Sequence, residues 1–135
     1  MRFLVVAFLL GSMLYAAHID EYATKMGFER QYAKGLQQAK EQGLKLLVMI
    51  TKEQCGWCRR FEKRTLKDQE VQKLLDQKFV VVVLDKYHDK GEYPSEKLKA
   101  PFTPKSFVVD PTSERVLKEF NGYVAKDDFI QRLEK

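Results

Sequence analysis

The chain has 135 residues, of which 44% are hydrophobic and 32% charged, and its formal net charge is +5. This composition is that of one globular domain and excludes a disordered or low-complexity chain. The basic residues are spread along the chain among nearly as many acids, with no block of like charge and no interleaved aromatic residues. The sequence therefore gives little support to nucleic-acid binding.

The N-terminus has the layout of a secretory signal peptide. Arg2 supplies a positive start, and an unbroken apolar run and then small residues follow it. We expect residues 1–16 to be a signal peptide, with cleavage after Ala16 or Ala17, and the protein to be periplasmic or otherwise exported. The apolar run is short for a membrane span, and anchoring by residues 3–17 stays open as an alternative.

After the leader we expect an N-terminal extension, residues 17–28, and then one folded domain, residues 29–135. Apolar or small side chains recur at a spacing of three or four, at Phe28, Tyr32, Leu36 and Ala39. This spacing predicts an amphipathic helix within residues 18–42 that ends near Gly43.

Two continuous apolar runs, residues 44–51 and 79–84, predict buried parallel strands. The helical pattern between them extends to Leu75 and is interrupted near Asp68. We expect Asp68 to cap a second helical stretch there. The order strand, helix, strand follows from these signals.

The rest of the chain alternates loops and short elements. Residues 86–101 are polar and predict a long connection with one short helical turn from Ser95. Residues 106–110 and 115–120, separated by a turn, predict an antiparallel hairpin, and apolar residues within 129–133 predict a terminal helix. Together the elements indicate a single α/β domain.

Cys55 and Cys58 are the only cysteines and lie in a Cys-Gly-Trp-Cys segment just after the first strand. At the start of a helix, free backbone N–H groups and the helix dipole favour a thiolate, so we expect a lowered pKa for Cys55. Cys58 follows about one turn later, where its sulfur can attack a mixed disulfide formed on Cys55. We therefore assign Cys55 as the nucleophile and Cys58 as the resolving cysteine, with this redox-active disulfide in place of any cofactor.

Other interpretations of the segment have less support. A zinc site needs two further ligands, and the chain offers only His18, His88 and carboxylates, so we expect no metal. A purely structural disulfide over so short a span would add little stability. Trp57 is either an aromatic side chain packed on its own helix or an apolar platform that meets a partly folded substrate, and both interpretations stay open.

The chain resembles the thioredoxin-like superfamily in four features. These are the strand before the Cys pair, Thr103-Pro104 ahead of a later strand, the closing hairpin, and Gly122 before the last helix. The resemblance implies a thioredoxin-like fold with a central mixed β-sheet flanked by helices. It also implies a cis-proline at Pro104 against the Cys pair and substrate pairing by the backbone of Thr103, so Trp57, Thr103 and Pro104 are candidate substrate-binding residues.

The segment after Cys58 also resembles the exported domains that terminate transmembrane thiol reductases, and the active site resembles that of periplasmic disulfide isomerases. These resemblances imply thiol:disulfide exchange with protein substrates. Many oxidising relatives carry His where Trp57 stands, and without an imidazolium to stabilise the reduced thiolate the Cys pair should be less strongly oxidising, which favours a reductase or an isomerase. We expect a reductase. A disulfide isomerase and a redox-inert peptide-binding module are the alternatives. The electron donor is unidentified, with a membrane thiol reductase as one candidate.

Two departures from the family pattern concern proton transfer. Met49 stands where thioredoxins place a buried Asp, and no proline lies between the cysteines. Proton removal from Cys58 must therefore use water or another group. Glu53 is the candidate acceptor that the sequence offers.

Overall fold

The computed structural model describes residues 17–135, and the predicted signal peptide lies outside the described residues. The elements in chain order are α1 His18–Met26, α2 Tyr32–Gln42, β1 Lys45–Thr51, α3 Gly56–Phe61, the π-helix η1 Glu62–Leu66, α4 Gln69–Lys78, β2 Phe79–Asp85, β3 Lys105–Val109, β4 Val116–Asn121 and α5 Lys126–Glu134. Within residues 17–135 no helix has the length and hydropathy needed to cross a membrane.

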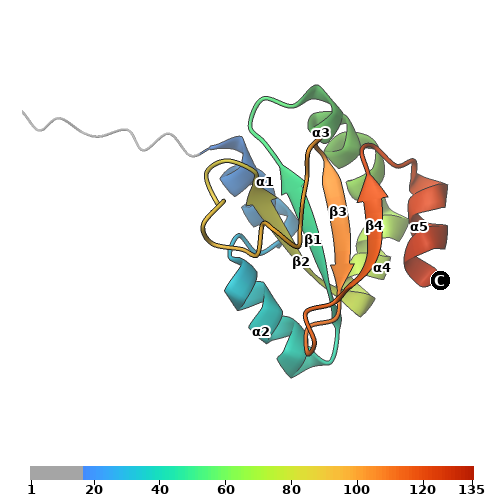
Figure 1. Ribbon diagram of the computed structural model, residues 1–135. Coiled ribbons are helices and arrows are strands. Elements are labelled where there is room, and N and C mark those ends of the chain that lie inside the picture. Colours follow the sequence, from blue (N-terminus) through green and yellow to red (C-terminus); the bar gives the residue numbers. More distant parts are fainter. Residues whose placement is uncertain (1–16) are drawn as a thin grey trace, which may run out of the picture.

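The four strands form one mixed sheet in the order β2-β1-β3-β4 (Figure 1). β1 pairs with β2 in parallel and with β3 in antiparallel orientation, and β3 and β4 form an antiparallel pair. The predicted strands and hairpin are thus confirmed. Because successive side chains of a strand point to opposite faces, each inner strand supplies two separate cores.

One core is covered by α1, α3, η1, α4 and α5, which surround alternate residues such as Leu47 and Met49 of β1. The other core, built on Leu46, Val48 and Ile50, is covered by α2. The connection over residues 86–101 covers that second core as well, since its Leu98 and Ala100 are buried there. One turn of this connection closes by hydrogen bonds to the carbonyl of Pro94, close to the helical turn expected from Ser95.

The helix predicted to end near Gly43 is α2, which ends at Gln42 with Gly43 as its C-cap. The chain also forms α1 in residues expected as an extension. α1 ends at Gly27, whose φ of 72° is the left-handed conformation in which a side chain is strained. The backbone of Glu29 then pairs with the outer edge of β2, accepting a hydrogen bond from Val83 and donating one to Val81. The short extended segment around Glu29, paired with the edge of the sheet, thus separates α1 from α2.

Residues 17–28, expected as an extension, contain α1 and pack against the folded domain. Ile19 and Ala23 are completely buried in the first core. Arg30, just beyond the bridge, pairs with Asp20 of α1 through Nε at 2.8 Å and with Asp89 through a terminal nitrogen at 2.8 Å. The guanidinium group therefore joins α1 to the connection that follows β2.

The interruption predicted near Asp68 is present, and Asp68 caps α4. Its Oδ1 accepts hydrogen bonds from the backbone N–H groups of Glu70 (2.9 Å) and Val71 (3.2 Å). Burial opposes ionisation, but these two bonds and the nearby Lys126 together hold the pKa of Asp68 below its usual value. Before the cap, the backbone N–H of Lys67 donates to the carbonyl of Glu62, which is the five-residue spacing of a π-helical turn.

The close contact between α2 and β2 at Gly35 gives a testable prediction. A Cβ atom on Gly35 would lie 2.1 Å from Cγ2 of the buried Val82. Although alanine adds about 1 kcal/mol of helix propensity, overpacking costs about 1–3 kcal/mol, and we expect Gly35→Ala to lower the free energy of unfolding in urea. Gly91→Ala is the matched control, since no atom lies within 4 Å of its new Cβ. Equal midpoints for the two variants would contradict the close packing.

Candidate functional site

Cys55 and Cys58 form a disulfide at the N-terminus of α3. Cys55 is the N-cap residue, and its Sγ accepts a hydrogen bond from the backbone N–H of Cys58 at 3.1 Å. Cys55 is partly exposed, whereas Cys58 is only 1% exposed. An approaching molecule therefore meets Cys55 first, with Cys58 behind it at the helix start.

Thr103 and Pro104 lie beside the disulfide, and the peptide bond between them is cis. Sγ of Cys55 is 3.4 Å from the hydroxyl oxygen of Thr103 and 3.6 Å from its carbonyl oxygen. A disulfide sulfur has no hydrogen to donate, so the hydroxyl is the donor in this contact. The same hydroxyl can donate to a Cys55 thiolate, for which a hydrogen bond is stronger.

Arg59 fastens the loop between β1 and α3. One terminal nitrogen donates to the carbonyl of Glu53 at 3.0 Å, and the other donates to the hydroxyl of Thr51 at 3.2 Å and to the carbonyl of Lys52 at 3.1 Å. Because Arg59 stands on the first turn of α3, these bonds set the path of the chain into Cys55. The positively charged side chain of Arg59 therefore holds this loop in place beside the Cys pair.

Glu62 is a buried carboxylate one turn beyond Cys58, with 8% exposure. Its Oε2 lies 2.9 Å from Nε of Arg59 and 3.0 Å from Nε2 of His18. The Nε–H of Arg59 is not aimed at the carboxylate, so that contact is mainly one of charge. Burial, and then the Glu62 charge, raise the pKa of Tyr22, which keeps this neighbouring phenol neutral.

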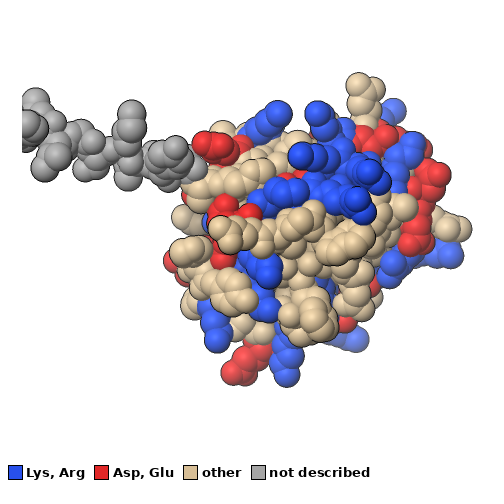
Figure 2. All heavy atoms as spheres, turned by 90° about the horizontal axis from the view of Figure 1, so that it is seen from above, with Lys and Arg blue, Asp and Glu red and all other residues tan. Residues whose placement is uncertain are grey.

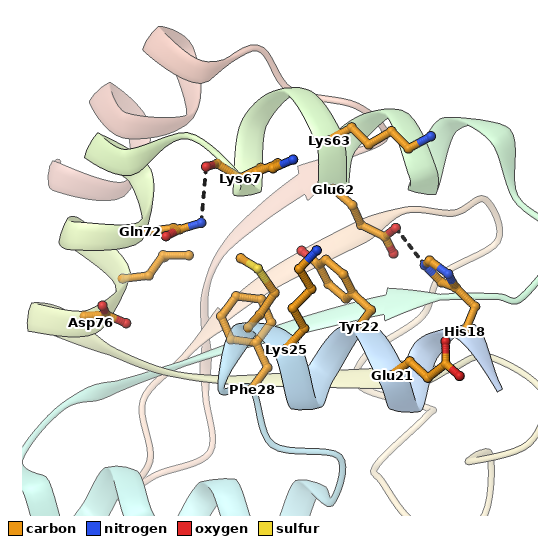
Figure 3. Close-up of a pocket in the computed structure, with 12 residues that line it drawn as sticks. His18, Glu21, Tyr22, Lys25, Phe28, Glu62, Lys63, Lys67, Gln72 and Asp76 are labelled. Carbon is orange, nitrogen blue, oxygen red and sulfur yellow. Dashed lines mark hydrogen bonds and ion pairs between the residues drawn. The ribbon is translucent and has the colours of Figure 1, made fainter. Parts of the chain in front are cut away.

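A cavity of about 10 Å³ lies between Glu62 and Cys58, with Pro104 in its wall. The atoms that line it are apolar, so a water molecule would find no hydrogen-bond partner there. On the other side of Glu62 a pocket of about 470 Å³ opens between α1 and the helices η1 and α4, as Figure 3 shows. Glu62 and Tyr22 line both spaces, and Glu62 and His18 point toward each other at the pocket wall (Figure 3). Glu62 therefore stands between the surface and the buried cysteine.

Glu53, the acceptor expected from sequence, occupies a different position. Its Oε1 accepts a hydrogen bond from the backbone N–H of Ile19 at 3.3 Å, in the first turn of α1. Among the described residues, Glu62 is the acidic residue that lines the cavity at Cys58. The spacing of four between Cys58 and Glu62 is a signal that could have found it, because such residues share one helix face.

Trp57 is 56% exposed and has neighbours on both sides. The guanidinium of Arg60 lies 4.8 Å from its ring centroid, and the ring of Tyr123 lies 6.1 Å away. Phe102, which precedes Thr103, is 83% exposed. Both interpretations of Trp57 keep support, since the indole packs on its own helix and still leaves half of its surface open.

The two histidines lie in different parts of the domain. The imidazole of His18 pairs with Glu62, and His88 stands in the turn after β2, where its backbone N–H donates to Oδ1 of Asp85 at 2.8 Å. Within residues 17–135, no group of three or more His, Cys, Asp and Glu side chains is placed to hold a metal ion.

Residues 32–135 match the family of thioredoxin-like domains. This chain belongs to that family. The thioredoxin-like fold with a mixed sheet flanked by helices, expected from the sequence, is thereby confirmed. A search of curated protein sequences finds no significant match.

Solved structures are similar to this thioredoxin-like domain at low identity. A thioredoxin from Thermus thermophilus has 22% identity and a TM-score of 0.70, covering 79% of this chain and 84% of that one. The oxidised DsbD C-terminal domain of Neisseria meningitidis has 21% identity and a TM-score of 0.61, with coverages of 88% and 97%. A disulphide isomerase from Xylella fastidiosa Temecula1 has 20% identity and a TM-score of 0.63, with coverages of 90% and 97%. Likeness at these identities shows the fold.

The contact between Thr103 and Cys55 gives a prediction about thiolate reactivity. Thr103→Val keeps the shape of the side chain and removes the donor, so we expect the pKa of Cys55 in the reduced domain to rise. Alkylation by iodoacetamide near pH 7 should slow by about threefold to tenfold, which corresponds to about 0.7–1.4 kcal/mol, the usual net contribution of one hydrogen bond. Alkylation rates measured across pH test this, with Thr103→Ser as the control that keeps the hydroxyl. Identical pH profiles for Val and Ser would contradict the contact.

The position of Glu62 predicts a second effect, on the resolving cysteine. Glu62→Gln should slow attack by Cys58 on a preformed mixed disulfide by about tenfold or more, because loss of a proton acceptor has effects of at least that size. Glu53→Gln should change the rate little. Stopped-flow release of a labelled peptide from Cys55 measures both variants. A slow Glu53→Gln beside a normal Glu62→Gln would favour the sequence-based candidate instead.

Proposed function

We propose that this thioredoxin-like domain is an exported thiol:disulfide oxidoreductase that reduces disulfides in protein substrates. The observation that carries the proposal is the disulfide at the N-terminus of α3, with Cys55 accessible, Cys58 buried and Thr103 in contact with Cys55. Membership of the family supports protein thiol or disulfide partners in general. Export rests on the signal-peptide pattern of residues 1–16.

The reaction begins with the reduced domain. The Cys55 thiolate attacks one sulfur of a substrate disulfide, the substrate S–S bond breaks, and the departing cysteine takes up a proton. Cys58 then loses its proton and attacks the Cys55 sulfur, which breaks the mixed disulfide and releases the second substrate cysteine. Two electrons pass to the substrate, and the domain is left with the Cys55–Cys58 disulfide that the structure holds.

The proton of Cys58 leaves by way of Glu62 in this proposal. Cys58 and Glu62 line the same small cavity and lie four positions apart in the helix, so the carboxylate is the acidic group that we place nearest to the buried thiol. The pocket on the far side of Glu62 connects the carboxylate with solvent. Glu62 thus serves as the proton acceptor for Cys58, a role that the thioether of Met49 cannot fill.

Reduction is the favoured direction because Trp57 stands where an imidazolium would stabilise the reduced form. An external donor must then return two electrons to Cys55–Cys58, and a membrane thiol reductase is the candidate that we propose. Disulfide isomerisation is the second candidate, supported by the exposed Trp57 and Phe102, which offer apolar surface to a partly folded substrate. A redox-inert peptide-binding module would use the same exposed side chains without exchange.

The reduction potential of the Cys pair tests the direction of transfer. We expect a value near the thioredoxin end of the scale, about −270 mV, when the mature domain is equilibrated with dithiothreitol buffers and free thiols are counted. A value near about −120 mV would overturn the reductase and indicate an oxidant or isomerase. In insulin reduction by the same samples, Cys55→Ser should be inactive and Cys58→Ser should accumulate a mixed disulfide. Activity retained by the double Ser variant in cells would indicate the binding module.

A further inference from the structure

The outward side of α3 and η1 carries four cationic side chains that begin beside the disulfide. These are Arg60, Lys63, Arg64 and Lys67, and we call them the cationic face. All four are exposed, and among the described residues none of them pairs with a carboxylate. Figure 2 shows Lys and Arg side chains gathered over the end of the molecule at which α3 lies.

The fold produces this concentration of charge from a mixed stretch of sequence. Glu62 is the only acid between Cys55 and Lys67. It is buried and paired with Arg59 and His18, so its charge is compensated inside the molecule and does not neutralise the cationic face. Phe61 and Leu66 also turn inward. The folded domain therefore presents a concentration of positive charge on this surface, although the sequence shows no block of like charge.

The cationic face is continuous with the exposed aromatic surface at the disulfide. Arg60 lies over the ring of Trp57, at 4.8 Å from its centroid, and so links the two. At about 1.5 Å per residue, the stretch from Trp57 to Lys67 is roughly 15 Å long. Such a length suits one side of a small protein–protein interface, in which aromatic and Arg side chains are enriched.

We propose that the cationic face and Trp57 dock an acidic protein partner of the disulfide exchange. The inference rests on the proposed function, because the face begins at a disulfide whose exchange partner must itself carry a thiol or disulfide. A nucleic acid fits less well, because it carries neither a thiol nor a disulfide that could exchange with the Cys pair at which the face begins. Complementary charge would speed encounter and turn the partner's cysteine toward Cys55.

Two peptides that differ only in charge test the proposal. Each contains the same intramolecular disulfide, flanked by Glu residues in one peptide and by Gln in the other. The reduced full-length mature domain is mixed with each peptide, and its oxidation is followed by the fluorescence of Trp57, the single tryptophan. We expect the acidic peptide to react about tenfold faster at low ionic strength, and the ratio of rates to fall toward one as added salt screens the charges.

Charge-neutral variants locate the effect on the surface. The variant Arg60→Gln, Lys63→Gln, Arg64→Gln, Lys67→Gln should lose the preference, so that the ratio of the two rates falls to about one. The matched control replaces Lys34, Lys40, Lys73 and Lys78 by Gln. These lysines are exposed and unpaired among the described residues, so the control loses the same formal charge from α2 and α4. The control should keep the preference.

The possible outcomes separate this inference from the function on which it rests. If both peptides are reduced at equal rates at low salt, the acidic-partner proposal is overturned and the oxidoreductase stands. If neither peptide is reduced, the oxidoreductase itself fails. If the ratio is one but labelled single-stranded DNA or anionic vesicles bind and the four-residue variant abolishes that binding, the face belongs to another class of ligand. The salt dependence of the unsubstituted domain keeps the test valid if the variant does not fold.

Discussion

Strand β1 is hydrogen-bonded on both edges and buried on both faces, and the position of the site follows from this constraint. All of its residues after Lys45 are buried between the two cores. Because β2 runs parallel to β1, the C-terminal ends of both strands lie at the same end of the sheet, and the antiparallel β3 starts at that end. The segment leaving Thr51 and the segment entering β3 therefore meet. This is why Cys55 and Thr103 are in contact although 48 positions separate them.

Burial of a single carboxylate organises the interior of the site. An ionised group is costly to bury unless charges compensate it, and Glu62 has Arg59 and His18 beside it. The same guanidinium holds the loop that leads to Cys55 through Thr51. The compensation of Glu62 and the path of the loop thus depend on one side chain, that of Arg59, and a change in it would affect both.

Sequence reasoning succeeded where the signal is local. The cap at Asp68, the hairpin, the apolar strands and the spacing of Cys55 and Cys58 are each written in a few neighbouring residues. It failed where distant groups decide. Residues 17–28 were expected as an extension, because the burial of Ile19 and Ala23 depends on packing against strands and helices that are distant in the sequence. In the sequence Glu62 lies among basic residues, a pattern typical of a solvent-exposed surface. Its inward orientation depends on the packing of α1 against η1, which brings His18 to the carboxylate.

The π-helical turn at η1 also affects how this chain is compared with others. A π-helical turn contains one residue more than the α-helical turn that it replaces. A relative whose helix is regular throughout would therefore need one residue fewer between Cys58 and the cap at Asp68. Any alignment with such a relative must open a one-residue gap within Glu62–Leu66, or it will equate an inward carboxylate with an outward cation. The number of residues between Cys58 and Asp68 is thus a structural feature of this chain, separate from which amino acids occupy those positions.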